Sequence, residues 1–213
     1  MKALSSKPLR GFTLIELLTV IAIIGILAAI IIPTTGAVRT ATKKAQTKSQ
    51  FSQWAQAMTL YKQEYGFYPP INRASYGTAA ANKINVDAFA AALTGRQKDG
   101  TAFATNADPD ELFGNKKRSA FYSLADSDLN AAKTAVVDAF GNEDIAVIYD
   151  RNGDGRITTA DLDSGGVPTV APLDGSALTP DTGITASEGP RAGVIFYSAG
   201  KGTNAKDIVY SWK

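Results

Sequence analysis

Residues 150–161 carry oxygen-bearing groups at a regular spacing that suits the binding of a cation. Side-chain or carbonyl oxygens recur at every second position, a final carboxylate follows, and Gly155 stands where the chain must turn sharply. Calcium is a hard cation that takes about six to eight oxygen ligands, and this spacing gathers such oxygens around one point. The sequence therefore predicts a structural Ca²⁺ site. Its ligands would be Asp150, Asn152, Asp154, the carbonyl of Arg156, Thr158 and Asp161.

The same stretch fits the pattern of the EF-hand calcium loop. Asp161 occupies the last position, where most such loops carry Glu, so the stretch resembles the dockerin type of loop. Residues 145–149 before it are typical of a strand, so we expect an isolated loop that fixes this strand when calcium binds. The alternative is an acidic turn without an ion, because Asn-Gly and Asp-Gly are common turn formers.

Glu16 is the one charged residue in an otherwise uncharged, largely apolar stretch, residues 12–32. These 21 residues are enough for a transmembrane helix, which needs about 20 predominantly apolar residues. Basic residues precede the stretch, so the short N-terminal tail should stay in the cytoplasm and the rest of the chain should lie outside. A carboxylate inside a membrane segment is unfavourable, and it therefore marks a functional site whose partner has to be identified.

The residues around this stretch resemble the class III signal of type IV pilins and type II secretion pseudopilins. The similar residues are Lys7-Pro-Leu-Arg-Gly11 followed by Phe12-Thr-Leu-Ile-Glu16, and Pro33 stands where family members often carry a helix-kinking proline. The resemblance implies that residues 1–11 are a leader, that prepilin peptidase cleaves after Gly11, and that Phe12 is then N-methylated. It also implies an assembly role for Glu16, whose natural partner is the new amino terminus of Phe12 on a neighbouring copy.

An ordinary signal peptide and an uncleaved anchor are the two alternatives for this segment. The apolar run is longer than the roughly 7–15 residues of an ordinary signal peptide core. A glutamate near the start of the run also fits both alternatives poorly.

One long helix should run from this segment to about Tyr65. Aromatic and methionine side chains recur at steps of three and four residues, as they do on the buried face of a helix. Gly66 and Pro69-Pro70 should end the helix. From residue 12 to residue 65 it would measure roughly 80 Å, a length that suits a filament with a buried helical core. The core-facing residues should be Phe51, Trp54, Met58 and Tyr61.

The middle of the chain is predicted to form short helical pieces. Residues 85–93 should be a helix with Asn85 as its N-cap and Gly95 as its stop. Residues 108–113 and 126–137 should also be helical.

The last third of the chain is typical of strands. Three runs are rich in β-branched and aromatic residues, and they should form an antiparallel sheet. These runs are residues 145–149, 194–198 and 208–212. Residues 163–192 are rich in Gly, Pro, Ser and Thr, so a long surface loop is expected. The expected fold class is α+β and pilin-like, with a long N-terminal transmembrane helix packed against a small antiparallel sheet and a folded domain over residues 33–213.

Two further stretches resemble those of major pseudopilins. Asp138-Ala-Phe-Gly-Asn142 is similar to the motif before their sheet, and residues 197–212 look like their final hairpin. That hairpin usually holds a calcium site in the family. Asp207 matches it, whereas Lys201-Gly202 stands where the family has Asp-Gly, so a second calcium site near Asp207 stays an open alternative.

The composition excludes several classes of function. The chain has no cysteine and no histidine, which excludes disulfides, Cys-ligated metals and histidine-dependent catalysis. Its net charge is +2, and its Lys and Arg residues do not cluster as they do in nucleic-acid-binding proteins. We therefore expect neither an enzyme nor a nucleic-acid-binding protein.

These features together predict a structural subunit of a type II secretion pseudopilus, assembled from the inner membrane to promote protein export. A type IV pilin or a minor pseudopilin is the alternative in the same class. A membrane-tethered, calcium-dependent carbohydrate-binding or hydrolytic domain is the alternative in another class. The expected partners are further copies in a filament, prepilin peptidase, the inner-membrane secretion platform and minor pseudopilins. We expect a single membrane span with a periplasmic C-terminal domain.

Overall fold

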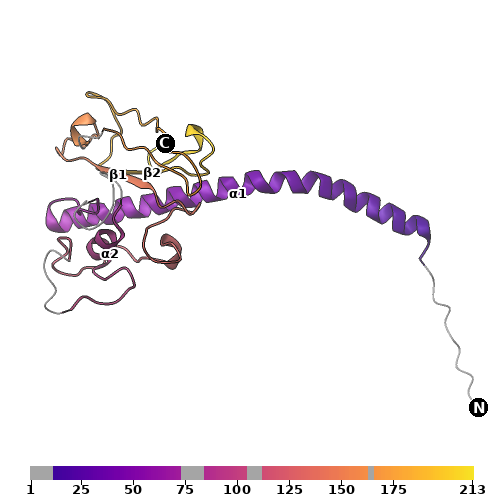
Figure 1. The fold of residues 1–213 in the computed structure, drawn as a ribbon, viewed down its shortest axis with the longest axis horizontal. Helices are drawn as coiled ribbons and strands as arrows, with labels where there is room; N and C mark the ends of the chain where they lie inside the picture. Colours follow the sequence, from indigo (N-terminus) through magenta and orange to yellow (C-terminus); the bar gives the residue numbers. More distant parts are fainter. Residues whose placement is uncertain (1–11, 73–83, 105–111, 163–165) are drawn as a thin grey trace, which may run out of the picture. The chain divides into compact units, whose positions relative to one another are not determined.

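The computed structural model describes residues 12–72, 84–104, 112–162 and 166–213, and for residues 30–35 it describes the backbone alone. The chain divides into two compact units, Met1–Ala41 (the N-terminal unit) and Thr42–Lys213 (the C-terminal unit). One helix, α1 (Leu14–Tyr65), contributes residues to both units (Figure 1). The C-terminal unit adds a second helix and a three-stranded sheet.

Helix α1 follows the predicted course. It begins at Leu14, shortly after the predicted start, continues through Pro33 and ends at Tyr65. Gly66 stops it in the left-handed region at φ +83°, and the Gly66 N–H donates to the carbonyl of Lys62 at 2.8 Å. The predicted long helix and its end are therefore confirmed.

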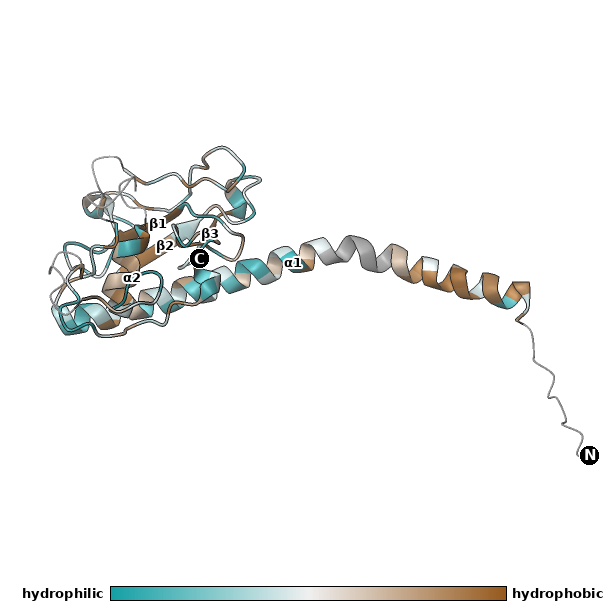
Figure 2. Cartoon of the chain, turned by 60° about the horizontal axis from the view of Figure 1, so that its bottom comes forward, coloured by the Kyte–Doolittle hydropathy of each residue, from teal (hydrophilic) through white to brown (hydrophobic). Residues whose placement is uncertain are grey.

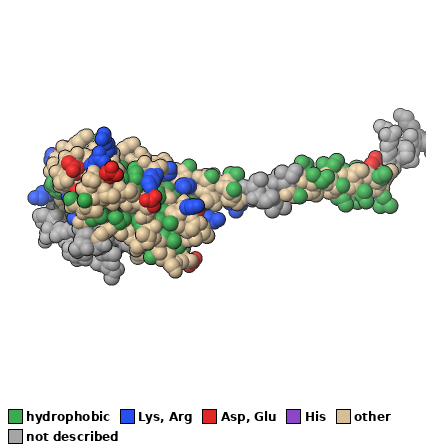
Figure 3. Space-filling view, turned by 90° about the horizontal axis from the view of Figure 1, so that it is seen from above, with side chains coloured by type: hydrophobic (Ala, Val, Ile, Leu, Met, Phe, Trp, Pro, Cys, Tyr) green, Lys and Arg blue, Asp and Glu red, His purple; other side chains and the backbone are tan. Residues whose placement is uncertain are grey.

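The N-terminal unit exposes apolar side chains along α1: Figure 2 marks the hydrophobic residues of this stretch, and Figure 3 shows hydrophobic side chains on its surface. Phe12 is 81% exposed and Leu14 is 87% exposed. Further exposed apolar residues are Ile15, Leu17, Leu18, Val20, Ile21, Ile23, Ile24, Ile26 and Leu27. Among the side chains that the structure describes, no helix offers a stretch of the length and apolarity that crossing a membrane requires. The last three residues of the predicted span, 30–32, lie outside those described side chains.

The C-terminal unit has its core on one stripe of α1. The predicted stripe is confirmed, because none of its four side chains has any exposed surface. These are Phe51, Trp54, Met58 and Tyr61. The Phe51 ring stacks on Phe196 of the sheet with centroids 5.8 Å apart, and the Trp54 ring meets Phe89 of the second helix edge-on at 5.0 Å. This part of the helix is thereby fixed between the sheet and the second helix.

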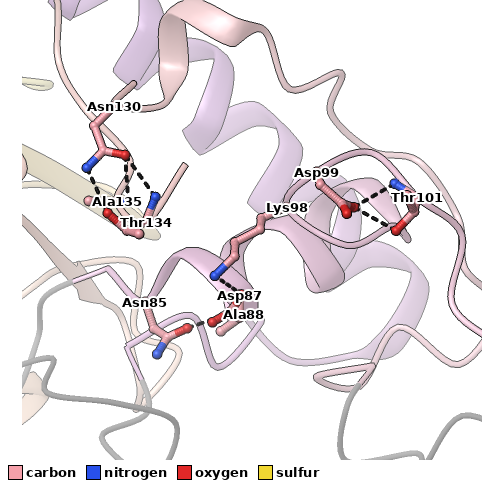
Figure 4. A network of polar contacts seen from close by, with 9 residues as sticks. All are labelled: Asn85, Asp87, Ala88, Lys98, Asp99, Thr101, Asn130, Thr134 and Ala135. Carbon is pink, nitrogen blue, oxygen red and sulfur yellow. Dashed lines mark hydrogen bonds and ion pairs between the residues drawn. The ribbon is translucent and has the colours of Figure 1, made fainter. Parts of the chain in front are cut away.

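Helix α2 (Val86–Thr94) is capped at both ends by the residues that the sequence indicated. The Asn85 side chain accepts the N–H of Ala88 at 3.0 Å (Figure 4). Gly95 adopts φ +67° and donates to the carbonyl of Ala91. The predicted short helix is therefore confirmed, and its apolar face packs on Trp54.

The sheet has the order β1-β2-β3, with β1 (Ile145–Tyr149), β2 (Val194–Ser198) and β3 (Val209–Tyr210) all antiparallel to their neighbours. Successive side chains of β1 and β2 point to opposite faces, and both faces are buried, one against α1 and the other under residues of the segments 157–162 and 166–192. The predicted strands β1 and β2 are confirmed at both ends. The fold is α+β, with helix packed on a small antiparallel sheet.

The third strand is shorter than the predicted 208–212, and a side chain explains why. The Ser211 N–H still donates to the Phe196 carbonyl at 3.0 Å. The Phe196 N–H, however, donates to the Ser211 hydroxyl at 3.0 Å instead of to a backbone carbonyl. The ladder therefore ends at Tyr210.

The prediction of a helix at 126–137 was wrong. Only Asp126–Asp128 forms a single 3-10 turn, and Leu129 pairs with Val136 in an isolated antiparallel bridge. The Asn130 side chain accepts the N–H of Thr134 at 2.8 Å, which draws the backbone into a turn (Figure 4). A short polar side chain has displaced the helical hydrogen bonds.

Two other predictions concern the loops. The predicted helical piece 108–113 falls largely on residues 108–111, which lie outside the described residues. Residues 166–192 are the described part of the predicted loop. Within them the backbone pairs as a strand would only at an isolated β-bridge between Val170 and Leu178. That prediction of a loop is confirmed for the residues described.

Candidate functional site

The start of α1 places Glu16 in a hydrogen-bonded cap. Thr13 stands just before the helix, and both its N–H and its hydroxyl donate to Glu16 Oε2, at 2.8 Å and 2.7 Å. The Glu16 N–H lies 3.3 Å from the Thr13 hydroxyl. This reciprocal arrangement is a capping box, which satisfies backbone N–H groups at a helix start. The glutamate also complements the positive end of the helix dipole.

The capping box was missed in the sequence, although its signal is present. Thr-x-x-Glu before an apolar run is the pattern that predicts it, and Thr13 and Glu16 provide it. Of the predicted processing and assembly residues, Phe12 lies two residues before α1 and Glu16 lies in its first turn. Gly11 lies outside the described residues.

The surroundings of Glu16 are apolar and uncovered. Its carboxylate stands at the start of α1, where the large apolar side chains from Leu14 to Leu27 are exposed. A helix that is hydrophobic all round is normally buried, in a membrane or in a protein core. The N-terminal unit therefore has the chemistry of a segment that needs a partner surface, with a single acid at its end.

The second candidate site is the loop 150–161 at the end of β1. Asp150 lies at its entrance and is 5% exposed. Its two oxygens accept the N–H groups of Gly153 at 2.7 Å and Gly155 at 2.8 Å. Both glycines adopt positive φ, at +77° and +79°, so the loop can wrap tightly around this carboxylate.

Asp161 closes the loop from its other end and is fully buried. Its Oδ1 accepts the Arg151 N–H at 2.8 Å and lies 3.4 Å from the Asn152 nitrogen. Its Oδ2 accepts the Thr158 N–H at 2.8 Å and the Thr158 hydroxyl at 3.2 Å. One carboxylate thus ties the first and last thirds of the loop together.

The exposed rim of the loop carries Asn152 and Asp154, two more of the predicted ligands. Asp154 accepts the Arg156 N–H at 2.8 Å, and its second oxygen accepts the Asn152 amide at 3.0 Å. Within the described residues, no three or more acidic side chains converge closely enough to hold a metal ion. The predicted donors are all oxygens, the kind of ligand that calcium takes, and both Asp161 oxygens already accept hydrogen bonds within the loop.

The loop is joined to the sheet and to a distant segment. Ile157 is fully buried in the core under the sheet, and its N–H donates to the Pro190 carbonyl at 2.9 Å. Thr159 donates to the carbonyl of Thr185 at 3.1 Å. A Cβ at Gly189 would lie 1.8 Å from the Ile157 carbonyl oxygen, so only glycine fits there. Backbone hydrogen bonds therefore join the loop directly to the segment 185–190 that leads into β2.

The Asp138–Asn142 stretch proves to be a buried polar junction. Asp138 Oδ2 accepts the Ser198 hydroxyl at 2.6 Å and the Asn142 amide at 3.0 Å. Its Oδ1 accepts the N–H groups of Phe140 and Asn142 at 2.8 Å and 2.9 Å. The Asn142 amide also donates to the carbonyl of Gly200 at 2.7 Å. The stretch therefore fastens the end of β2 to the chain before β1.

The turn between β2 and β3 holds the second acid singled out by the sequence. Asp207 Oδ2 accepts the Thr203 hydroxyl, the Thr203 N–H at 3.0 Å and the Asn204 N–H at 3.1 Å. These bonds, above all the one from the Thr203 hydroxyl, lower the pKa of Asp207. The carboxylate acts here as a cap for a 3-10 turn, Ala205–Asp207.

The comparison with known families agrees with the geometry of the N-terminal unit. Residues 8–32 match the family model of the prokaryotic N-terminal methylation motif. This motif is typical of type IV pilins and pseudopilins, and it implies processing by prepilin peptidase and association with a membrane. No curated protein and no solved structure matches the chain. The predicted resemblance is thus confirmed for the segment that carries Gly11, Phe12 and Glu16.

Proposed function

We propose that this chain is the structural subunit of a membrane-assembled filament, the pseudopilus of a type II secretion system. The match of residues 8–32 to the methylation motif carries the proposal. In this function residues 1–11 are removed after Gly11, Phe12 is methylated, and residues 12–32 serve first as a membrane span and then as filament core. The C-terminal unit lies in the periplasm. We infer a structural and not a catalytic role.

The pseudopilus is favoured over a type IV pilus by the C-terminal unit. Its junction at Asp138-Ala-Phe-Gly-Asn142 and its closing hairpin resemble those of major pseudopilins. The inner-membrane secretion platform and minor pseudopilins would be its partners, and the platform would supply the energy of assembly. A type IV pilin or a minor pseudopilin is the alternative within the same class.

Glu16 would act by pairing with the amino terminus of Phe12 on the neighbouring subunit. Opposite charges in an apolar filament core are favourable only as a pair, and an unpaired charge is strongly destabilising. The subunit alone already engages Glu16 with Thr13, so the carboxylate is held at the helix start before a neighbour arrives. Assembly would exchange or extend these contacts.

Two substitutions at Glu16 separate charge from capping. Glu16→Gln keeps an N3 side chain that can complete the capping box but removes the negative charge. Glu16→Leu removes both. We expect both variants to be inserted and processed normally, and both to give much less sedimentable filament than the unchanged chain in cells that carry the secretion machinery.

The outcomes distinguish the roles. Normal filament yield from Glu16→Leu would contradict the assembly role. Normal yield from Glu16→Gln with loss in Glu16→Leu would assign Glu16 to capping alone. A Thr13→Ala variant, which weakens the cap and keeps the charge, is the matched control and should assemble better than Glu16→Gln.

We further propose that loop 150–161 binds a structural Ca²⁺ ion through the six predicted ligands. The support is the oxygen donor set and the two glycines that let the loop wrap. The ion would offset the repulsion among the loop's carboxylates and fix β1 against the segment at 185–190. Calcium-containing surroundings outside the cytoplasm suit such a site.

A further inference from the structure

The first turns of α1 within the C-terminal unit, residues 42–48, carry several lysines on a partly exposed helix surface. None of residues 42–46 is buried, whereas Thr47 and Phe51 are fully buried just beyond them. We call Lys43, Lys44 and Lys48 the basic face of α1. On the side drawn in Figure 3, Lys and Arg side chains gather around this part of the helix.

The charge of α1 has a single sign over most of its length. Residues 17–63 include five cationic residues and no Asp or Glu. Lys44 and Lys48 are one turn apart, a spacing at which like charges repel. Lys43 lies over the Phe140 ring at 5.6 Å, and Lys48 donates to the carbonyl oxygen of Lys213. Within the described residues, no Asp or Glu side chain forms an ion pair with the basic face.

A second part of the chain has the opposite charge. Residues 157–190 contain five acidic residues and no Lys or Arg. In the described portion, residues 166–190 (the acidic loop), Asp174, Asp181 and Glu188 are all exposed. Asp181 pairs with Lys213 at 3.4 Å, while Asp174 and Glu188 form no ion pair with any described residue.

The acidic loop holds one of these acids on an anchored turn. The Leu173 N–H donates to the Asn142 side chain at 3.1 Å, and Leu173 is 65% exposed. Gly202 packs so closely on Pro172 that a Cβ there would lie 2.3 Å from the Pro172 Cβ. The turn therefore presents Asp174 from a fixed backbone, and a contact there loses little loop entropy on binding.

We propose that the acidic loop of one copy docks on the basic face of α1 of the next copy. The two surfaces are different, so the contact is head-to-tail, and a head-to-tail contact that does not close on itself propagates as a filament. Complementary charges guide the encounter and fix the register of neighbours. The proposal rests on the filament function proposed above, and it names the contact between folded units that would accompany packing of the apolar helices.

The absence of cysteine from the chain permits a clean test by cross-linking. Full-length Lys44→Cys is coexpressed with full-length Asp174→Cys or Glu188→Cys in cells that carry the secretion machinery, and filaments are oxidised mildly. We expect a disulfide-linked dimer with at least one of the two acidic-loop variants. Lys44→Cys with Asp99→Cys, an exposed acid outside the loop, is the matched control and should give little dimer.

Charge reversal provides the second measurement. Lys44→Glu and Asp174→Lys alone should each lower filament yield roughly fivefold, because each subunit would then lack one exposed ion pair with its neighbour. The double variant should recover most of the yield. Sheared filaments from the unchanged chain are the reference, and their absence would contradict the filament function itself.

With filaments present, two results would overturn the docking. One is no dimer from either acidic-loop variant, or no more than from the Asp99→Cys control. The other is loss of binding of Lys44→Glu to phosphatidylglycerol vesicles, relative to phosphatidylcholine vesicles, with unchanged filament yield. That result would assign the basic face to an anionic membrane surface.

Discussion

Single carboxylates organise the C-terminal unit at three places, and each accepts backbone N–H groups together with at least one side-chain donor. Asp161 closes its loop, Asp138 fastens the end of β2, and Asp207 caps the last turn. A buried acceptor that loses its donors costs the folded state far more than an exposed one. Replacing the carboxylate should therefore lower the free energy of unfolding most where the side chain is fully buried, as it is for Asp161.

The loop 150–161 allows a structural effect to be separated from an effect of the ion. Asp161→Asn replaces an acceptor oxygen by an NH₂ group that faces backbone N–H groups, so we expect it to lower the free energy of unfolding by about 1–3 kcal/mol, with or without calcium. Asp154→Ala changes an exposed side chain and should cost little in chelator. It should, however, abolish most of the rise in melting temperature that we expect calcium to give the unchanged protein.

Thermal unfolding of the C-terminal unit in calcium and in chelator measures both effects. An unchanged protein whose melting temperature ignores calcium would contradict the ion site and leave the structural role of Asp161 standing. Equal responses of Asp154→Ala and the unchanged protein would also contradict the site.

At the scale of elements, local signals decided which predictions held. The step of three and four residues among the aromatic side chains located the core stripe of α1, and Asn85 and Gly95 located both ends of α2. The same approach gave a wrong helix prediction for residues 126–137, because the Asn130 side chain accepts a backbone N–H and draws the chain into a turn. A composition compatible with helix does not reveal such a competitor.

The two ends of α2 should differ in their sensitivity to alanine. Asn85→Ala removes the N-cap and should lower the free energy of unfolding by about 1 kcal/mol. Gly95→Ala forces a Cβ into the left-handed region, where it would also lie 2.4 Å from the Arg118 carbonyl oxygen, and should cost about 2 kcal/mol or more.

Chemical unfolding of the two variants tests this order. Gly100→Ala is the matched control, because Gly100 also has positive φ, at +84°, but a Cβ there meets nothing within 4 Å. A Gly95→Ala variant no less stable than Gly100→Ala would contradict the close approach of Arg118.

At the scale of the whole molecule, the sequence predicted the class of fold and left the long-range junctions unseen. Strands β1 and β2 could be read from their β-branched residues. The bond from Ser198 to Asp138 joins residues 60 positions apart, and no local pattern signals it. The same holds for the contacts of loop 150–161 with Thr185 and Pro190. Thr13 is a different case, because its capping pattern was present in the sequence and overlooked.

Buried tyrosines spread through the C-terminal unit predict how the folded state responds to alkali. Burial raises the pKa of three tyrosines, and a neighbouring group raises each one further. These are Tyr61 beside Tyr65, Tyr122 beside Asp128, and Tyr197 beside Tyr210. An unfolded tyrosine ionises near pH 10, so the folded state binds protons more tightly above that pH. Stability should be insensitive to these groups below about pH 10 and should fall as pH rises further.

Tyrosinate absorbance and circular dichroism, followed together during alkaline titration, measure this response. The buried tyrosines should ionise only as the structure is lost. Ionisation of all tyrosines near pH 10 with the circular dichroism unchanged would contradict their burial. Tyr122→Phe removes one such group together with its hydrogen bond to Asp128. The free energy of unfolding of this variant should therefore fall less steeply with pH above about pH 10 than that of the unchanged protein.

The junction at Asp138 has a consequence for the order of events in time. A chain is synthesised from N to C, so Asp138 and Asn142 exist before Ser198, which donates to Asp138, and Gly200, which accepts from Asn142. Such distant contacts form late in folding, because a long loop must close first. The junction therefore cannot close before residues 198–200 have been synthesised. Its two long-range hydrogen bonds are thus among the last contacts that the C-terminal unit can gain.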